Sequence, residues 1–280
     1  MSRPVDVLLE FLEAEQARGV THVHLDDGAR EALRGVFNSA KAKKAAPAPA
    51  AEIRLDPPPA PVAAAKISIE GATRAEQLDS LRHQAENWAP AKSLGSLRET
   101  MVFSIGNPEA RVMLVGEAPG YQEERERQPF VGPAGQKLND ILKAMGLSRE
   151  EVYISNIVKF RPSTPKQTTN NRKPNAGEIA ACLPFIRAEI GIVRPACIVA
   201  LGETAAEGLL GITGTVASTR EKWHDYEGTP VRITYHPSYL LQTGDGHQTK
   251  RQVWEDMLAV MEKLEMPVSA KQRGFFLPKA

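Results

Sequence analysis

The sequence predicts an α/β fold of three layers, in which a central, mostly parallel four-stranded sheet is covered by helices on both faces. Four short runs rich in β-branched and other apolar residues alternate with amphipathic stretches of helical period. The runs are continuously apolar, which is typical of strands buried on both faces of a parallel sheet. Ligands of such sheets bind beyond the carboxyl ends of the strands, so the residues that follow each run are candidate site residues.

Strands and helices are expected to alternate along residues 67–265, the expected main domain, after a first helix at 75–88. This alternation indicates parallel strands joined by crossover helices. The strands are expected at 111–115, 152–158, 197–201 and 231–235, and the later helices at 135–145, 175–190, 204–210 and 251–264.

Residues 1–40 are expected to form a small N-terminal appendage, with helices at 5–18 and 29–37 around a short strand at 21–25. Residues 41–66 are dominated by Ala and Pro, with hardly a large apolar side chain to bury. We therefore expect an Ala/Pro-rich linker there, and a C-terminal tail at 266–280.

The length of 280 residues suffices for one α/β domain plus an appendage. No uninterrupted apolar run approaches the ~18 residues that a membrane-spanning helix needs, so we expect no membrane association. Asp6, Glu10 and Glu13 interrupt what would have to be the apolar core of a signal peptide. The expected location is therefore the cytoplasm.

The 35 Lys and Arg residues are balanced by 34 Asp and Glu residues, so contact with nucleic acid must come from a local basic patch. A candidate patch at 159–173 contains five cations and no acidic residue, and it could follow a phosphate backbone. The alternative is an ordinary solvated surface loop. The five cations are Lys159, Arg161, Lys166, Arg172 and Lys173.

Polar motifs follow three of the expected strands. Gly116 and Glu117 open a Gly/Pro-rich turn, in which the glycines let the backbone approach a ligand closely. Phe130 lies in a second Gly/Pro-rich loop, just before a helix. Asn156 ends the second strand and offers an amide that can read a base edge. The last strand runs into His236-Pro-Ser-Tyr-Leu-Leu241, which supplies an imidazole, a hydroxyl and large apolar side chains in one turn.

Together and in this order, these motifs resemble the family 4 uracil-DNA glycosylases, the iron-sulfur type of bacterial and archaeal repair enzymes. The stretches 152–159 and 198–206 also follow the family pattern. The resemblance covers about residues 67–264. It implies a monofunctional hydrolase of base excision repair, which breaks the N-glycosidic bond of uracil in DNA and leaves an abasic site. The expected substrate is uracil-containing DNA, single- or double-stranded, bound by a monomer.

The resemblance also implies roles at the matching positions. His236 would donate to the uracil oxygen on which charge accumulates, and Glu117 would orient water or balance the sugar cation. The flipped uracil would be held by stacking, by hydrogen bonds to its edge and by a carboxylate near C5 that helps to exclude thymine. These uracil-binding residues would be Phe130, Asn156, Glu123 and Gly116.

For the grip on DNA, the resemblance implies that Ser238 contacts a flanking phosphate. Leu240 would be the wedge that fills the vacated stack, which offsets an unstacking cost of about a few kcal/mol. Lys159, Arg161 and Arg172 from the basic stretch would contact the DNA backbone.

Each of these residues also has a simpler interpretation. A glutamate on a Gly-rich turn often only caps the next helix, as Glu117 could, and His236 could be structural. Phe130 and Leu240 could belong to the core. Their joint occurrence at the ends of successive strands favours a functional site.

The resemblance fails at the cysteines. The family holds a four-iron, four-sulfur cluster with four cysteines, whereas residues 81–98 contain none and Phe160 occupies the third position. Only Cys182 remains at a cluster position, so we predict no metal and no cofactor. We expect packing of Trp88 or Leu94 against Phe160 to replace the cluster.

Gln272, Phe275 and Phe276 resemble the short peptide by which bacterial repair proteins dock on the sliding clamp. The alternative is that the two aromatic side chains fold back and cover the domain.

Two other functions are open on the residues. One is a catalytically weak DNA-binding or damage-recognition module of the same fold. The other is a glycosylase for another deaminated base, such as hypoxanthine.

Overall fold

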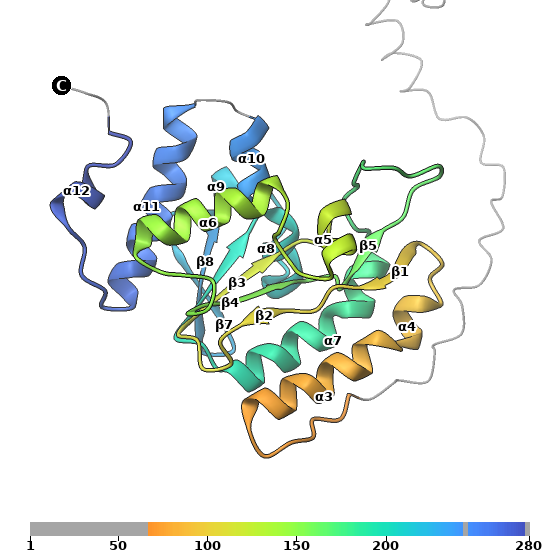
Figure 1. Ribbon diagram of the computed structural model, residues 1–280. Helices are drawn as coiled ribbons and strands as arrows, with labels where there is room; N and C mark the ends of the chain where they lie inside the picture. The colour runs from red at the N-terminus through yellow and green to blue at the C-terminus, as the bar shows by residue number, and fades with distance from the viewer. Residues whose placement is uncertain (1–66, 243–245, 278–280) are drawn as a thin grey trace, which may run out of the picture. The chain divides into compact units, whose positions relative to one another are not determined.

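A six-stranded sheet forms the centre of the computed structural model, which describes residues 67–242 and 246–277 (Figure 1). The appendage and linker expected at 1–66 lie outside the described residues. The strand order is β2-β4-β3-β6-β8-β7, and the inner four strands are parallel. The strands are β2 (Ile105–Gly106), β3 (Val112–Gly116), β4 (Tyr153–Asn156), β6 (Cys197–Leu201), β7 (Trp223–Tyr226) and β8 (Thr229–Thr234).

The structure confirms the predicted fold class but not the number of strands. The four expected strands are the four inner, parallel ones. The short β2 and β7 add an antiparallel edge on each side. Neither edge strand has the continuous apolar run that a strand buried on both faces shows, which is why the sequence pattern missed them.

Helices cover both faces of the sheet (Figure 1). Along β3, Met113 and Val115 enter one apolar cluster while Val112 and Leu114 enter the other. One cluster includes helices α3 (Arg74–Glu86), α4 (Ala89–Lys92), α7 (Ala176–Val193) and α8 (Glu203–Leu210), and the other includes α6 (Pro133–Met145) and α11 (His247–Lys263).

The longer helices begin and end at recognisable signals. Thr73 and Glu76 form a capping box at the start of α3, and Asn175 and Glu178 form another at the start of α7. Gly146 ends α6 with φ 82°, a left-handed conformation that favours glycine. The helices expected within residues 67–265 are confirmed within a few residues at each end.

Seven further elements were not predicted by sequence period. The short helices are α4, α5 (Tyr121–Glu126), α9 (Val216–Thr219), α10 (Pro237–Gln242) and α12 (Ala270–Arg273). A separate two-stranded antiparallel ladder pairs β1 (Leu97–Met101) with β5 (Phe160–Pro162). All are too short to show a helical or strand period clearly.

Among the described residues, no helix combines the length and the apolar composition that crossing a membrane requires.

A buried ion cluster joins α11 to the sheet edge. The Asp256 carboxylate lies 2.7 Å from Arg232 Nη2 and 3.1 Å from Arg220 Nε. The Asp256 side chain is fully buried. The side chain of Arg220 is 2 % exposed and that of Arg232 is 7 % exposed. Two buried guanidinium groups thus share this carboxylate, and Arg220 also pairs with the exposed Glu221.

We expect Asp256→Ala to lower the free energy of unfolding by about 3–5 kcal/mol, because Arg220 and Arg232 would stay buried without this counter-charge. Glu255→Ala is the matched control, since the Glu255 carboxylate lies 4.0 Å from Arg220 on a side chain that is 45 % exposed. It should cost at most about 1 kcal/mol. Urea unfolding measures both, and equal losses would contradict this account of the cluster.

Candidate active site

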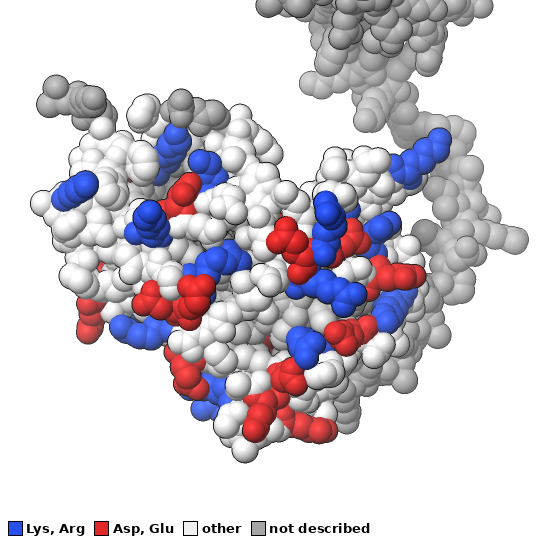
Figure 2. Space-filling view, viewed as in Figure 1, with Lys and Arg blue, Asp and Glu red and all other residues white. Residues whose placement is uncertain are grey.

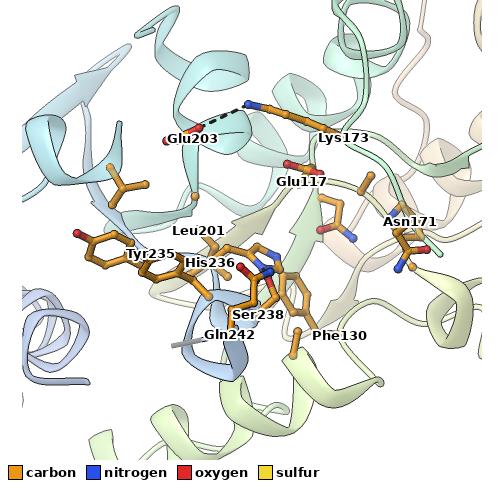
Figure 3. A pocket seen from close by; sticks show the side chains of 18 of the residues that line it. Glu117, Phe130, Asn171, Lys173, Leu201, Glu203, Tyr235, His236, Ser238 and Gln242 are labelled. Atoms are coloured by element: carbon orange, nitrogen blue, oxygen red, sulfur yellow. Dashed lines mark hydrogen bonds and ion pairs between the residues drawn. The ribbon is translucent and has the colours of Figure 1, made fainter. Parts of the chain in front are cut away.

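A cavity of about 680 Å³ opens at the carboxyl ends of the four parallel strands (Figure 3). Each strand contributes a residue at or just after its last position. These are Glu117 after β3, Asn156 on β4, Gly202 after β6 and His236 after β8. The parallel register therefore brings the expected site residues of three separate motifs to one cavity.

The inner wall is formed by an amide and an aromatic ring. Asn156 is buried, and its Oδ1 has no hydrogen-bond partner among the described residues. A Cβ atom on Gly116 would lie 2.4 Å from Asn156 Oδ1 and 2.4 Å from Phe130 Cζ. Glycine is thus needed for the amide and the ring to come together. A buried acceptor without a donor costs about 1–3 kcal/mol, which a ligand N–H can recover.

The loop that carries Phe130 is held by polar groups on both sides. Phe130 has φ 56°, a left-handed conformation that is uncommon for an aromatic residue. Glu123 Oε1 accepts from the backbone N–H groups of Val131 and Gly132 at 3.0 and 2.8 Å. Arg149 donates to the Phe130 carbonyl at 3.0 Å. Glu123 lines the cavity as expected, but its oxygens serve the loop backbone.

The tautomer of His236 follows from its neighbours. The backbone N–H of Ser238 donates to His236 Nδ1 at 3.2 Å, so Nδ1 is an acceptor and the proton is on Nε2. The Ser238 hydroxyl also lies 2.8 Å from Nδ1. Burial lowers the pKa of His236 to about 4, so the imidazole is neutral at physiological pH. The ring lies 5.6 Å from that of Phe130 between centroids.

Glu117 lies between the Phe130–His236 pair and an ion pair at the cavity mouth (Figure 3). The Thr204 hydroxyl donates to its carboxylate. Burial raises the pKa of Glu117 above its ordinary value. Across the mouth, Lys173 Nζ lies 3.7 Å from Glu203 Oε2, with both side chains about half exposed. Lys173 lowers the pKa of Glu117, and Glu203 raises it.

The DNA-backbone contacts expected of Lys159 and Arg161 are wrong, because both side chains are buried. Lys159 Nζ lies 2.8 Å from the Glu189 carboxylate and donates to the Asn156 carbonyl at 3.0 Å. Arg161 pairs with Glu124 at 2.9 Å. Lys159 therefore supports the strand end that carries Asn156 instead of reaching solvent.

Arg172 is also engaged with the protein. Its guanidinium group binds the buried Glu178 carboxylate at 2.6 Å and the Ser96 carbonyl at 2.8 Å. The exposed cations of the expected basic stretch are Lys166 and Lys173. The stretch therefore presents less positive charge than the sequence predicts, and Lys and Arg alternate with Asp and Glu on the face in Figure 2.

The wedge expected at Leu240 is also wrong. Leu240 is buried, and α10 packs against α6. The large side chains that α10 exposes are Tyr239 and Leu241, at 40 % and 43 %. Neighbouring positions on a helix face different directions, which is why Leu240 is buried while Tyr239 and Leu241 are exposed.

The described residues do not fit an iron-sulfur cluster. Cys182 and Cys197, the two cysteines of the sequence, belong to the apolar clusters on opposite faces of the sheet. Burial raises the pKa of Cys182 to about 11 and that of Cys197 to about 12, whereas metal ligands must be thiolates. Among the described residues, no group of three or more His, Cys, Asp or Glu side chains could hold a metal ion.

Packing joins the segments at which the family pattern places the cluster cysteines. Trp88 Nε1 donates to the Ala181 carbonyl at 2.7 Å, and the ring meets Phe185 edge-to-face at 4.9 Å. Trp88 and Phe160 lie in one apolar cluster. The alternative expectation for Leu94 is wrong, because its side chain is 40 % exposed.

The C-terminal segment folds onto the domain. Gln272 Nε2 donates to the Ala144 carbonyl at 2.9 Å, and Phe275 packs on Trp254 at 5.3 Å between centroids. Phe276 and Leu277 are the exposed large apolar side chains there. Gln272 and Phe275 are therefore held on the domain, and the expected docking on a sliding clamp stays a prediction.

Sequence reasoning missed Thr204, Arg149 and Lys173 as parts of the site. The signal for Thr204 is its position just after the third expected strand, where polar residues can reach a site at the strand ends. Arg149 has no comparable signal, since it acts through a contact with a loop some 20 residues away.

The chain is similar to known proteins over more than half of its length. Residues 103–258 match the family model described as the Uracil DNA glycosylase superfamily. The type-4 uracil-DNA glycosylase of Thermotoga maritima is 41 % identical over 162 residues, 57 % of this chain and 81 % of the relative. The type-4 uracil-DNA glycosylase of Pyrobaculum aerophilum is 39 % identical, over 53 % of this chain and 77 % of the relative. The type-4 enzyme of Sulfurisphaera tokodaii is 36 % identical, over 59 % of this chain and 77 % of the relative.

The ion pair at the cavity mouth predicts opposite effects on Glu117. We expect Lys173→Met to raise the pKa of Glu117 and Glu203→Gln to lower it, because the first removes a nearby cation and the second a nearby anion. Carboxyl-carbon NMR titration, with Glu117→Gln to assign the resonance, measures both. Shifts of the same sign in both variants would contradict the proposed electrostatic coupling.

Proposed function

The chain belongs to the uracil-DNA glycosylase superfamily, and we propose that the cavity at its strand ends is where it hydrolyses the N-glycosidic bond of uracil in DNA. The enzyme is a uracil-excising DNA repair glycosylase, a hydrolase. The observation that carries the assignment of the cavity is that Oδ1 of the buried Asn156 has no hydrogen-bond partner within residues 67–242 and 246–277. This oxygen is a fixed acceptor to which a ligand N–H group could donate.

An amide at this position suits uracil and not cytosine. Uracil presents the N3–H donor beside the O4 acceptor, whereas cytosine presents an acceptor at N3 beside an amino donor. Asn156 Oδ1 would accept from N3–H while its amide nitrogen donates to O4. Lys159 donates to the Asn156 carbonyl and is paired with Glu189, which fixes the end of the strand. The amide therefore cannot easily move to accommodate the wrong base. Phe130 would stack on the ring.

His236 would stabilise the leaving group without ionising. When the C1′–N1 bond breaks, its electron pair goes to N1 and uracil leaves as an anion. The neutral imidazole would donate its Nε2–H to the uracil oxygen on which this charge collects. Because Ser238 occupies Nδ1, the donating nitrogen is fixed toward the cavity.

Glu117 would act on the attacking water. Its carboxylate would accept a proton as the water oxygen bonds to C1′, and its charge would balance the sugar cation that precedes this bond. Thr204 holds one carboxylate oxygen, which orients the other. Because burial raises the pKa of Glu117, activity should fall on the acid side at a higher pH than for an ordinary glutamate.

Glu123 serves this chemistry through the loop. Its oxygens accept three backbone N–H groups, those of Gly120, Val131 and Gly132. We assign it the role of holding Phe130 against the base. Exclusion of thymine would then follow from the fixed position of the loop.

We expect Asn156→Ala and His236→Ala each to slow uracil release by about 10²–10³-fold, the cost of removing one donor of an oxyanion-type site. Single-turnover assays on an oligonucleotide with one uracil measure this. Gly191→Ala is a control, because an added Cβ there meets no heavy atom within 4 Å. Intact DNA after prolonged incubation with the wild type would overturn the proposed function.

We further propose that the enzyme works without an iron-sulfur cluster. The two buried cysteines on opposite sheet faces cannot supply the four thiolates that such a cluster takes. Ser96, Arg172 and Glu178 supply a link of another kind: the Ser96 hydroxyl and the Arg172 guanidinium group both bind the Glu178 carboxylate at 2.6 Å. This joins the segment before β1 and the loop after β5 to α7.

The purified protein should contain no iron, and a chelator should leave its melting temperature unchanged. Arg172→Met should lower the melting temperature, because Glu178 would lose its cation while staying buried. Lys173→Met, next in sequence and half exposed, is the control and should melt with the wild type. Stoichiometric iron with a melting temperature that falls on chelation would refute the proposal.

The expected partners beyond uracil-containing DNA stay predictions. Docking on a sliding clamp through Gln272, Phe275 and Phe276 would require α12 to leave the domain, since Gln272 and Phe275 are bound to it. The preference for single- or double-stranded DNA and the monomeric state likewise stay predictions.

A further inference from the structure

Two tyrosines form a stacked pair on the outer wall of the cavity. Tyr235 and Tyr239 have ring centroids 5.0 Å apart and an interplanar angle of 11°. Both line the cavity, and Tyr239 is 40 % exposed. Tyr235 lies beside His236, Ser238 and Gln242 in Figure 3. The roles proposed for the inner wall use neither ring.

The pair rests on a rigid support. The Arg220 guanidinium carbon lies 6.0 Å from the centroid of Tyr235, within cation–π range. Arg220 is buried and is itself held by Asp256 at 3.1 Å and by the Gln252 carbonyl at 2.6 Å. Tyr235 directly follows β8. An exposed ring stacked on a fixed ring loses little freedom when a third ring joins it.

The position of Tyr239 relates it to the site of bond cleavage. Its backbone N–H donates to the His236 carbonyl at 2.9 Å, so the two residues are one turn apart on the same short segment. Side chains three positions apart on a helix lie about 5–6 Å from each other at Cβ. A nucleotide that places its base against His236 therefore has its neighbour within reach of Tyr239.

The chemistry of this wall favours a base over a phosphate. Thr215, Val216, Ala217 and Gln242, which also line the cavity, are uncharged. The cation beside Tyr235 is the buried Arg220, which is paired with Asp256 and Glu221. Aromatic faces bind bases of any sequence by stacking. With Leu240 turned into the core, Tyr239 is the exposed aromatic side chain that α10 offers to DNA.

We propose that Tyr239, supported by Tyr235 and Arg220, is a stacking platform for the nucleobase adjacent to the flipped uracil. This inference rests on the proposed function, because it takes uracil as the occupant of the inner wall. The platform would hold the substrate strand on one side of the extrahelical nucleotide and would not depend on the identity of the stacked base.

The test measures binding and cleavage separately. For binding, single-stranded and duplex oligonucleotides carry 2′-fluoro-2′-deoxyuridine, whose fluorine destabilises the sugar cation and slows cleavage. A 2-aminopurine on the 5′ or the 3′ side reports stacking through quenching of its fluorescence. Matched oligonucleotides carry a baseless residue at the same position. Tyr239→Ala and Tyr239→Phe are compared with Leu94→Ala, a control with the same 40 % exposure outside the cavity lining.

We expect Tyr239→Ala to weaken binding about tenfold and to abolish the quenching on one side. The loss should vanish when the base on that side is missing. Tyr239→Phe and Leu94→Ala should behave as the wild type. Equal losses with and without the flanking base would show a merely structural role, and unchanged binding and quenching in Tyr239→Ala would also overturn the platform.

The cleavage arm separates this proposal from the proposed function. Normal uracil release without any effect of Tyr239→Ala on binding or quenching would refute the platform alone. Tight binding and quenching without release of uracil from the ordinary substrate would refute the proposed hydrolysis while the platform stands.

Discussion

The parallel register of the four inner strands is the constraint on which the site depends. It pairs Gly116 with Asn156 and Leu201 with Thr234, so the residues that follow each strand meet at one edge. Glu117, Asn156 and His236 are far apart in the sequence, yet they need no long loop to converge. A shift of one residue in any of these pairings would turn a site residue toward the opposite face of the sheet.

Buried charge holds this edge in place. Lys159 and Glu189 lie beneath Asn156, and Asp256 fixes Arg220 beneath the tyrosine pair. Desolvating such charges is costly, and they are retained here where a side chain must be placed accurately. A charged side chain also fixes the Phe130 loop. Glu123 accepts hydrogen bonds from backbone N–H groups that would otherwise bind water.

The family pattern places cluster cysteines on several segments of the chain. Here, side-chain and strand contacts join these segments. Trp88 packs on α7, and β1 pairs with β5. The Arg172–Glu178 pair closes the loop after β5. These contacts are spread over many residues, so the fold does not depend on any one thiolate. Trp88 lies in the apolar cluster that includes α3 and α7, whereas Arg172 also lines the cavity.

The sequence by itself determined the layered fold, the four parallel strands and the gathering of Glu117, Phe130, Asn156 and His236 around one cavity, because apolar runs and their order are local properties of the chain. Only the tertiary structure decided which polar and apolar side chains are free to meet DNA. Lys159 and Leu240 read as surface residues, yet Glu189 and α6 bury them. Burial depends on partners distant in the sequence, and no local pattern records those contacts.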